Sequence, residues 1–199
     1  MAKKLINRFW IDVAQTALVV ILAIVAVNWS YFAKQVSAWW LYDVLNTTST
    51  DMTVIDQPNR LVISSLGLNV PLVEVEATDE VTVQHGLEQG VVHYPNTAAP
   101  GEFGNAYYFG HSSDYAFKDG NYKTVFATLP RIEVGAEILI TNSAGRQFSY
   151  VVRDKKVVEA KDMSVLSQGD RTQKLLTMQT SWPLGTALKR YVVVAELVK

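Results

Sequence analysis

Two apolar runs near the C-terminus constrain the fold of this chain most strongly. The runs are Leu175–Met178 and Tyr191–Leu197, and a short segment that contains Trp-Pro-Leu-Gly separates them. Apolar and β-branched side chains bounded by proline and glycine are typical of two strands and their connection. Ser181 then ends the first strand, and Arg190 begins the second. The pattern predicts a hydroxyl and a guanidinium that face each other across neighbouring strand ends.

The chain from residue 56 onward has the pattern of a strand-rich domain. Short helices are expected at 78–90 and 122–129, the second ended by Pro130. Further strands are expected at Arg60–Ser64, Asn69–Glu76, Val91–His93, Asn105–Gly110, Glu137–Thr141 and Gln147–Val158. Seven or eight short strands with regularly spaced turn residues predict an all-β barrel or sandwich.

The N-terminal segment has the composition of a membrane anchor. Ala17–Val27 is an unbroken apolar run, and with its apolar flanks it reaches the roughly 20 residues that a bilayer crossing needs. Lys3, Lys4 and Arg8 precede it without an acidic residue, which predicts a cytoplasmic N-terminus and an extracellular domain. A cleavable signal peptide is disfavoured, because no small-residue cleavage site follows the run. We expect an anchor at 1–34, a juxtamembrane helix or linker at 35–55, and the folded domain at 56–199.

Composition excludes several classes of function. The formal net charge is −1 and no long charge block occurs, so nothing favours nucleic-acid binding. The chain has no cysteine, which excludes disulfides, thiolate metal sites and thiol chemistry in this chain. Acidic residues are scattered, and no metal site can be identified from their spacing.

His111 is the best candidate for a catalytic base, since it follows the expected strand that ends in Gly110. Three motifs occur in order behind the anchor: a His93-Tyr94-Pro95 run leading to Gly-His, then Thr177–Ser181, then Arg190. Together they resemble the sortase family, the membrane-anchored cysteine transpeptidases of the bacterial cell surface. The resemblance covers about residues 56–199 and implies an eight-stranded β-barrel with a few short helices. Serine stands where the family has its cysteine.

The resemblance implies a role for each motif residue. In sortases the nucleophile attacks the threonine carbonyl of a sorting signal like Leu-Pro-x-Thr-Gly, and an amine of a cell-wall precursor or a pilin lysine resolves the acyl-enzyme. The resemblance implies that Ser181 occupies the nucleophile position, that His111 acts as acid and base, and that Arg190 donates to the oxyanion. Thr180 and Trp182 flank the nucleophile position, and we expect them to contact substrate. No cofactor is implied, and the calcium dependence of some sortases cannot be assigned to positions here.

Serine at position 181 changes the expected chemistry. A thiol has a pKa of about 8.5 and can be held as a thiolate beside an imidazolium. A serine hydroxyl must instead lose its proton to a base during the attack. We therefore expect this chain to bind substrate and to transfer acyl groups slowly or not at all. The serine is either an introduced replacement or natural, and the intact remainder of the motifs favours the first.

Two other functions compete with this interpretation. One is a non-catalytic surface module that only binds sorting-signal peptides. The other is a serine hydrolase with a Ser-Lys dyad, for which Lys174 and Lys189 are near in sequence, although the Ser-Met motif of signal-peptidase-like enzymes is missing. Of the other histidines, His85 is expected at the surface of a helix and His93 in a packing or hydrogen-bonding role.

Overall fold

The structure is a computed structural model that describes residues 2–27, 29, 57–113 and 121–198. The expected juxtamembrane segment at 35–55 lies outside these residues. The helices are α1 (Ala2–Val27) and α3 (Glu80–Gln89), with 3₁₀ turns η1 (Ser64–Leu66), η2 (Leu129–Arg131) and η3 (Met163–Leu166). The strands are β1 (Arg60–Ile63), β2 (Leu68–Glu74), β3 (Val91–His93), β4 (Gly104–Phe109), β5 (Glu137–Thr141), β6 (Gln147–Glu159), β7 (Lys174–Trp182) and β8 (Lys189–Leu197).

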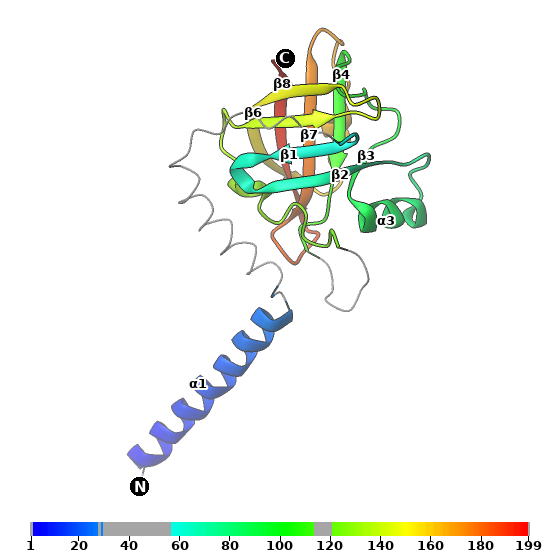
Figure 1. The fold of residues 1–199 in the computed structure, drawn as a ribbon. Coiled ribbons are helices and arrows are strands. Elements are labelled where there is room, and N and C mark those ends of the chain that lie inside the picture. The colour runs from blue at the N-terminus through cyan, green and yellow to red at the C-terminus, as the bar shows by residue number, and fades with distance from the viewer. Residues whose placement is uncertain (1, 28, 30–56, 114–120, 199) are drawn as a thin grey trace.

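The eight strands form a closed barrel in the order β1-β2-β3-β4-β7-β8-β6-β5, which confirms the predicted barrel (Figure 1). Pairing of β1 with β5 closes it, so each of the eight described strands has a hydrogen-bonded neighbour on both sides. The pairs β2–β3 and β4–β7 are parallel, and the others are antiparallel. The parallel pair β4–β7 places the ends of two strands far apart in sequence at the same end of the barrel.

Inward-facing side chains fill the barrel. Alternate residues of a strand point to opposite faces, so each strand contributes every second residue to the core. The largest fully buried side chains are Tyr108, Tyr150, Phe126, Leu61, Ile63, Leu129, Ile132, Ile138, Ile140, Leu176, Met178 and Val91. This interior is a packed core rather than a binding cavity, and any site must lie on the outer wall or at a barrel end.

Helix α3 makes the connection between the parallel strands β2 and β3. Asp79 caps its N-terminus by accepting a hydrogen bond of 3.0 Å from the backbone of Thr82, and this bond lowers the pKa of the Asp79 carboxyl. Gly86 lets the helix approach the sheet, since an added Cβ would lie 2.9 Å from Val75 Cγ1. A helix was expected at 78–90, and the structure confirms it.

The helix expected at 122–129 is wrong. The segment forms successive turns closed by backbone bonds between residues three apart, such as Val125 N to Tyr122 O at 3.1 Å. The backbone N–H of Phe126 donates instead to the carbonyl of His111 at 2.9 Å, which takes it out of any helical ladder. Tertiary bonding to the residue after β4 therefore overrides the local preference of this segment.

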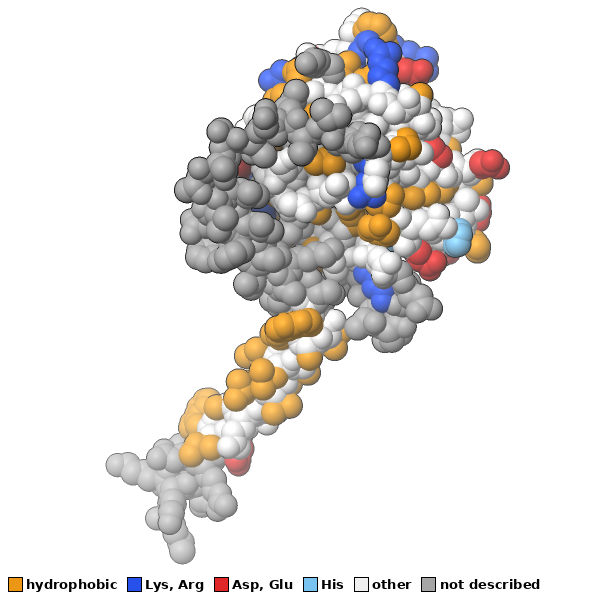
Figure 2. Space-filling view, viewed as in Figure 1, with side chains coloured by type: hydrophobic (Ala, Val, Ile, Leu, Met, Phe, Trp, Pro, Cys, Tyr) orange, Lys and Arg blue, Asp and Glu red, His pale blue; other side chains and the backbone are white. Residues whose placement is uncertain are grey.

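Helix α1 is long and apolar enough to cross a membrane. Its 26 residues span about 39 Å, more than the roughly 30 Å of a bilayer's hydrocarbon core. The candidate span is Trp10–Val27, none of which is buried against the protein. Many apolar side chains line the coloured part of α1 that is in view (Figure 2).

The tight turn at Gly101 yields the first prediction. Gly101 has φ +86° and its N–H donates to Tyr150 Oη at 2.8 Å, while an added Cβ would overlap the Phe148 ring. Gly145 has φ +76° and nothing within 4 Å of an added Cβ. We expect Gly145→Ala to cost about 1 kcal/mol of backbone strain, and Gly101→Ala to cost about 1–3 kcal/mol more through overlap. Urea unfolding of both variants measures the difference, and equal costs would contradict the packing.

Candidate active site

Three neighbouring strands bring the predicted site residues to one end of the barrel. β7 lies between β4 and β8. Phe109 is the register partner of Gln179, so His111, two residues further on, comes beside Ser181 when this parallel register is continued. Ser181 is in turn the register partner of Arg190. Ser181 and Arg190 are therefore cross-strand neighbours, and the register extended two residues past the end of β4 puts His111 next to Ser181. We call these three residues the row.

Backbone and side-chain hydrogen bonds fix the segment that carries His111. The Gly110 N–H donates to the Gln179 carbonyl at 3.2 Å, which extends the β4–β7 ladder by one residue. The Thr180 hydroxyl donates to the Gly110 carbonyl at 2.8 Å, and the Phe126 N–H donates to the His111 carbonyl. The backbone at Gly110 and His111 is thus hydrogen-bonded to β7 on one side and to Phe126 on the other.

Thr180 and Trp182, the predicted substrate contacts, face away from the outer wall. Thr180 is 2% exposed, and its hydroxyl is engaged with Gly110. The half-buried Trp182 ring packs against Tyr191, with ring centroids 5.6 Å apart. The sequence did not indicate the contact of Thr180 with the residue before His111.

The side chains at 181 and 190 share the outer face of the barrel wall. Met178 is in the core, so Ser181, an odd number of residues away, points outward. Arg190 lies two residues from Val192, which belongs to an outer cluster with Tyr107. Burial raises the pKa of the Tyr107 hydroxyl, and the positive charge of Arg190 opposes that rise. The guanidinium therefore acts on the same face as Tyr107.

An apolar cluster with members from β4, β6 and β8 lies on the outer face of the barrel wall, and we call it the outer cluster. Its fully buried members are Tyr107, Val165 and Val192, and its partly buried members are Tyr94, Phe109, Val158, Leu166 and Val194. Two of these, Val165 and Leu166, come from η3 in the β6–β7 connection. The outer cluster thus extends from this connection toward the row of His111, Ser181 and Arg190.

A polar clamp holds the β6–β7 connection against the start of β4. Asn105 donates through Nδ2 to the carbonyls of Val165 and Ser167, at 3.0 and 3.3 Å. Gln168 Oε1 accepts from the N–H groups of Asn105 and Ala98, at 3.0 and 3.1 Å, and its Nε2 donates to the Asn105 carbonyl. Asn105 and Gln168 are 63 residues apart in sequence, and no local pattern indicated the pair.

Ser181 also borders a pocket of about 280 Å³ at the barrel end. The pocket is lined by Ser112, Ala127, Pro130, Arg131, Thr180, Ser181, Trp182 and Leu184. Its wall combines apolar side chains, hydroxyl-bearing residues and Arg131, and it offers room for a side chain of a bound peptide beside Ser181.

Hydrogen bonds to Ser113 and Arg190 hold the loop at 183–188 that joins β7 to β8. The Gly185 N–H donates to Ser113 Oγ at 3.1 Å, which links this loop to the segment following His111. Arg190 Nη1 donates to the carbonyls of Ala187 and Lys189, both at 3.0 Å. The guanidinium is therefore oriented by the end of the loop.

Neither lysine of the proposed Ser-Lys dyad is placed to serve Ser181. Lys174 begins β7, seven residues before Ser181, which is about 23 Å along a strand. Its ammonium lies over the Phe103 ring at 4.7 Å. Lys189 is the register partner of Trp182, on the strand face opposite Ser181, and its Nζ pairs with Glu159 at 3.2 Å. The geometry disfavours a dyad.

The remaining histidines lie where the sequence predicted. His85 is exposed on α3 and its Nε2 contacts Gln89 Nε2 at 2.8 Å. His93 is buried and hydrogen-bonded to Glu74. Among the residues that the structure describes, no three His, Asp or Glu side chains gather in a group that could hold a metal ion.

Comparison with known proteins agrees with this fold. A family model described as the Sortase domain matches residues 61–198. Sortase D of Bacillus subtilis (strain 168) is 29% identical over 142 residues, which are 69% of this chain and 62% of that curated relative's length. The chain therefore spans less than two thirds of that protein.

Solved sortase structures are similar as well. A Clostridium perfringens sortase D5 transpeptidase superposes with a TM-score of 0.57 at 28% identity, covering 70% of this chain and 78% of that one. Sortase A from Corynebacterium diphtheriae gives 0.59 at 25% identity, with 80% and 67% covered. The chain belongs to the sortase family.

The Thr180–Gly110 bond yields the second prediction. Thr180→Val keeps the shape of the side chain but leaves the buried Gly110 carbonyl without this donor, so we expect a loss of about 1–2 kcal/mol in the free energy of unfolding. Thr141 is equally buried, and its hydroxyl has no hydrogen-bond partner among the described residues. Thr141→Val should therefore be neutral or stabilising. Equal losses in urea unfolding would show that the Thr180 bond contributes nothing.

Proposed function

We propose that this chain is a membrane-anchored sortase-type transpeptidase whose nucleophile position holds serine. It cleaves a sorting signal like Leu-Pro-x-Thr-Gly on a surface protein and passes the acyl group to an amine. The acceptor is a cell-wall precursor or a pilin lysine. The single observation that carries the proposal is the pairing of Ser181 with Arg190 on β7 and β8, beside the end of β4 from which the chain continues to His111.

The first step is attack of Ser181 Oγ on the carbonyl carbon of the substrate threonine. The bond from that carbon to the following amide nitrogen breaks, and an ester to Ser181 remains. His111 takes the hydroxyl proton during the attack and gives a proton to the departing amine. The half-buried position of His111 beside the row suits this exchange.

The second step reverses the first with a new amine. The acceptor nitrogen attacks the ester carbon while His111 accepts its proton, and Ser181 Oγ leaves with a proton returned by His111. The products are the joined peptide and the free enzyme. The pocket beside Ser181 offers room for one of the two amine-bearing groups.

Arg190 stabilises the charge that develops on the substrate carbonyl oxygen. Its guanidinium presents fixed donors, and its bonds to the carbonyls of Ala187 and Lys189 orient it before substrate arrives. We place the leucine and proline of the sorting signal along the outer cluster, whose apolar side chains lead to the row.

Serine makes the chemical step slow. Its hydroxyl cannot be stored as an anion beside an imidazolium as a thiol can, so the proton must move to His111 within the attack. Binding of the sorting signal depends on other contacts and is retained. Thr180 and Trp182 contribute to the pocket wall, where we propose that they limit which substrate groups fit.

The anchor places the reaction at the outer surface of the cell membrane. Residues 1–34 span the bilayer once, 35–55 link the span to the domain, and 56–199 form the domain outside. The apolar Trp10–Val27 helix supports the span, and the basic residues Lys3, Lys4 and Arg8 support a cytoplasmic N-terminus.

Restoring the thiol tests the proposal. In the detergent-solubilised full chain, Ser181→Cys should transfer a Leu-Pro-x-Thr-Gly peptide to an added amine at least about a thousandfold faster than the serine form. Ser181→Ala is the matched control and should bind the same peptide without transfer. Mass spectrometry of the product and of the acyl-enzyme measures both steps.

The other outcomes separate the competing functions. Peptide binding without transfer in the cysteine form would identify a non-catalytic binding module. Labelling of Ser181 by a fluorophosphonate probe in the native chain would favour a serine hydrolase. A cysteine form that neither binds nor transfers would contradict the proposal.

Arg190 is tested by a change that keeps its charge. In the Ser181→Cys background, Arg190→Lys should lower kcat/KM by about 10²–10³-fold, because an ammonium lacks the planar pair of donors. Arg153→Lys makes the same exchange at an exposed surface pair with Glu196 and should leave kcat/KM unchanged. Equal effects of the two exchanges would remove Arg190 from the oxyanion site.

A further inference from the structure

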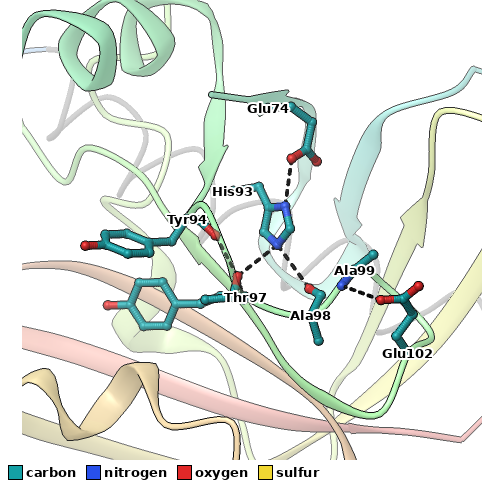
Figure 3. Close-up of polar contacts among 8 residues, drawn as sticks. Glu74, His93, Tyr94, Thr97, Ala98, Ala99 and Glu102 are labelled. Carbon is teal, nitrogen blue, oxygen red and sulfur yellow. Dashed lines mark hydrogen bonds and ion pairs between the residues drawn. The ribbon is translucent and has the colours of Figure 1, made fainter. Parts of the chain in front are cut away.

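His93 at the end of β3 has acceptors on both sides of its ring. Its Nδ1 lies 2.7 Å from Glu74 Oε2, and its Nε2 lies 3.0 Å from the Ala98 carbonyl and 3.0 Å from Thr97 Oγ1 (Figure 3). The residue is 7% exposed, so water does not provide alternative partners on most sides.

Counting the donors and acceptors around this ring favours one arrangement of its protons. A carbonyl oxygen only accepts, so Nε2 must carry a proton toward Ala98. The Thr97 hydroxyl gives its own proton to the Tyr94 carbonyl at 2.7 Å, so it also accepts from Nε2. An ionised Glu74 only accepts, so Nδ1 must carry a second proton. The doubly protonated ring satisfies every contact, with Glu74 as its counter-ion.

The same count shows that the group is not a nucleophilic triad. Glu74, His93 and Thr97 contact one another in the order carboxylate, imidazole, hydroxyl, which is the order found in a catalytic triad. A triad needs an unprotonated Nε2 to accept the hydroxyl proton. With Nε2 as the donor to Ala98 and the Thr97 hydroxyl donating to the Tyr94 carbonyl, no base is left to activate Thr97.

The groups that face His93 leave Glu74 to balance its charge. Tyr108 of β4 stacks on the ring at 4.7 Å and 22°. Burial, Glu74 and Tyr150 raise the pKa of Tyr108, so its hydroxyl stays neutral. Glu102 in the loop after β3 accepts from the Ala99 N–H at 3.3 Å. Glu74 itself lies at the surface of β2, with its side chain 67% exposed.

The contacts of His93 hold the turn at 94–98 against the outer cluster. Thr97 Oγ1, which accepts from His93, also accepts from the Tyr107 N–H at 3.3 Å. The Tyr94 N–H donates to the Tyr107 carbonyl at 2.8 Å. The Tyr94 ring meets the Tyr107 ring edge-on at 5.9 Å and lies 6.1 Å from the Phe109 ring. His93 thus fixes the turn that carries Tyr94, whose ring borders Tyr107 and Phe109. Both of these residues lie on β4, the strand that leads to His111.

We propose that His93 is a positioning residue, held as an imidazolium between Glu74 and the 94–98 turn, which orders the edge of the outer cluster where the sorting signal binds. The last clause rests on the proposed function. The charge state and the order of the turn do not, because they follow from the contacts of His93 alone.

Nitrogen NMR of the full chain tests the charge state directly. The chain has three histidines, at 85, 93 and 111, so histidine-selective ¹⁵N labelling gives three ring systems that His85→Gln and His93→Gln assign. At neutral pH we expect two protonated ring nitrogens for His93, each coupled to its proton. In Glu74→Gln, which changes an exposed side chain, the ring should lose one of them. A neutral His93 ring in the native chain would overturn the proposal.

Hydrogen exchange and kinetics test the positioning. His93→Gln should speed exchange of the Tyr107 amide at least about fivefold, and His85→Gln should not. In the Ser181→Cys background, His93→Gln should raise the KM for the sorting-signal peptide about tenfold with kcat within about threefold. Glu74→Gln provides the same readouts should His93→Gln fail to fold.

The outcomes separate this proposal from the proposed function. Slow exchange at Tyr107 in both His93→Gln and Glu74→Gln, or an unchanged KM in an active cysteine form, would overturn the positioning role. An inactive cysteine form together with a doubly protonated His93 and faster exchange would contradict the proposed function and support the structural role of His93.

Discussion

The hydrogen-bonded register of β4, β7 and β8 is the constraint on which the site depends. Parallel pairing aligns the end of β4 with the end of β7, and antiparallel pairing aligns the end of β7 with the start of β8. A shift by one residue would turn Ser181 from the outer wall into the barrel core. Closure of the barrel prevents such a shift, because every strand is paired on both sides.

Polar contacts over long sequence distances build the remainder of the site onto this register. Two hydrogen bonds fix the segment after β4, one from Thr180 to the Gly110 carbonyl and one from the Phe126 N–H to the His111 carbonyl. Asn105 and Gln168 fix the β6–β7 connection over the outer face. Each contact satisfies a backbone group that irregular structure would otherwise leave unpaired.

Much of this structure could be predicted from the sequence. The strand boundaries at the β7–β8 pair, the β5–β6 hairpin and the capped helix α3 follow from local patterns and agree with the structure. The helix at 122–129 was wrong because a tertiary bond from Phe126 won over local preference. The clamp of Asn105 with Gln168 and the buried bond of Thr180 had no sequence signal, because each joins residues more than 60 positions apart.

The central claim is that His111, Ser181 and Arg190 act on one carbonyl group. An experimental structure of the chain with serine at position 181 and a bound sorting-signal peptide tests it most directly. The account predicts the threonine carbonyl carbon in van der Waals contact with Ser181 Oγ, the guanidinium of Arg190 at its oxygen, and the His111 ring on the other side of Ser181. A peptide bound elsewhere, or any of the three side chains turned away from that carbonyl, would contradict it.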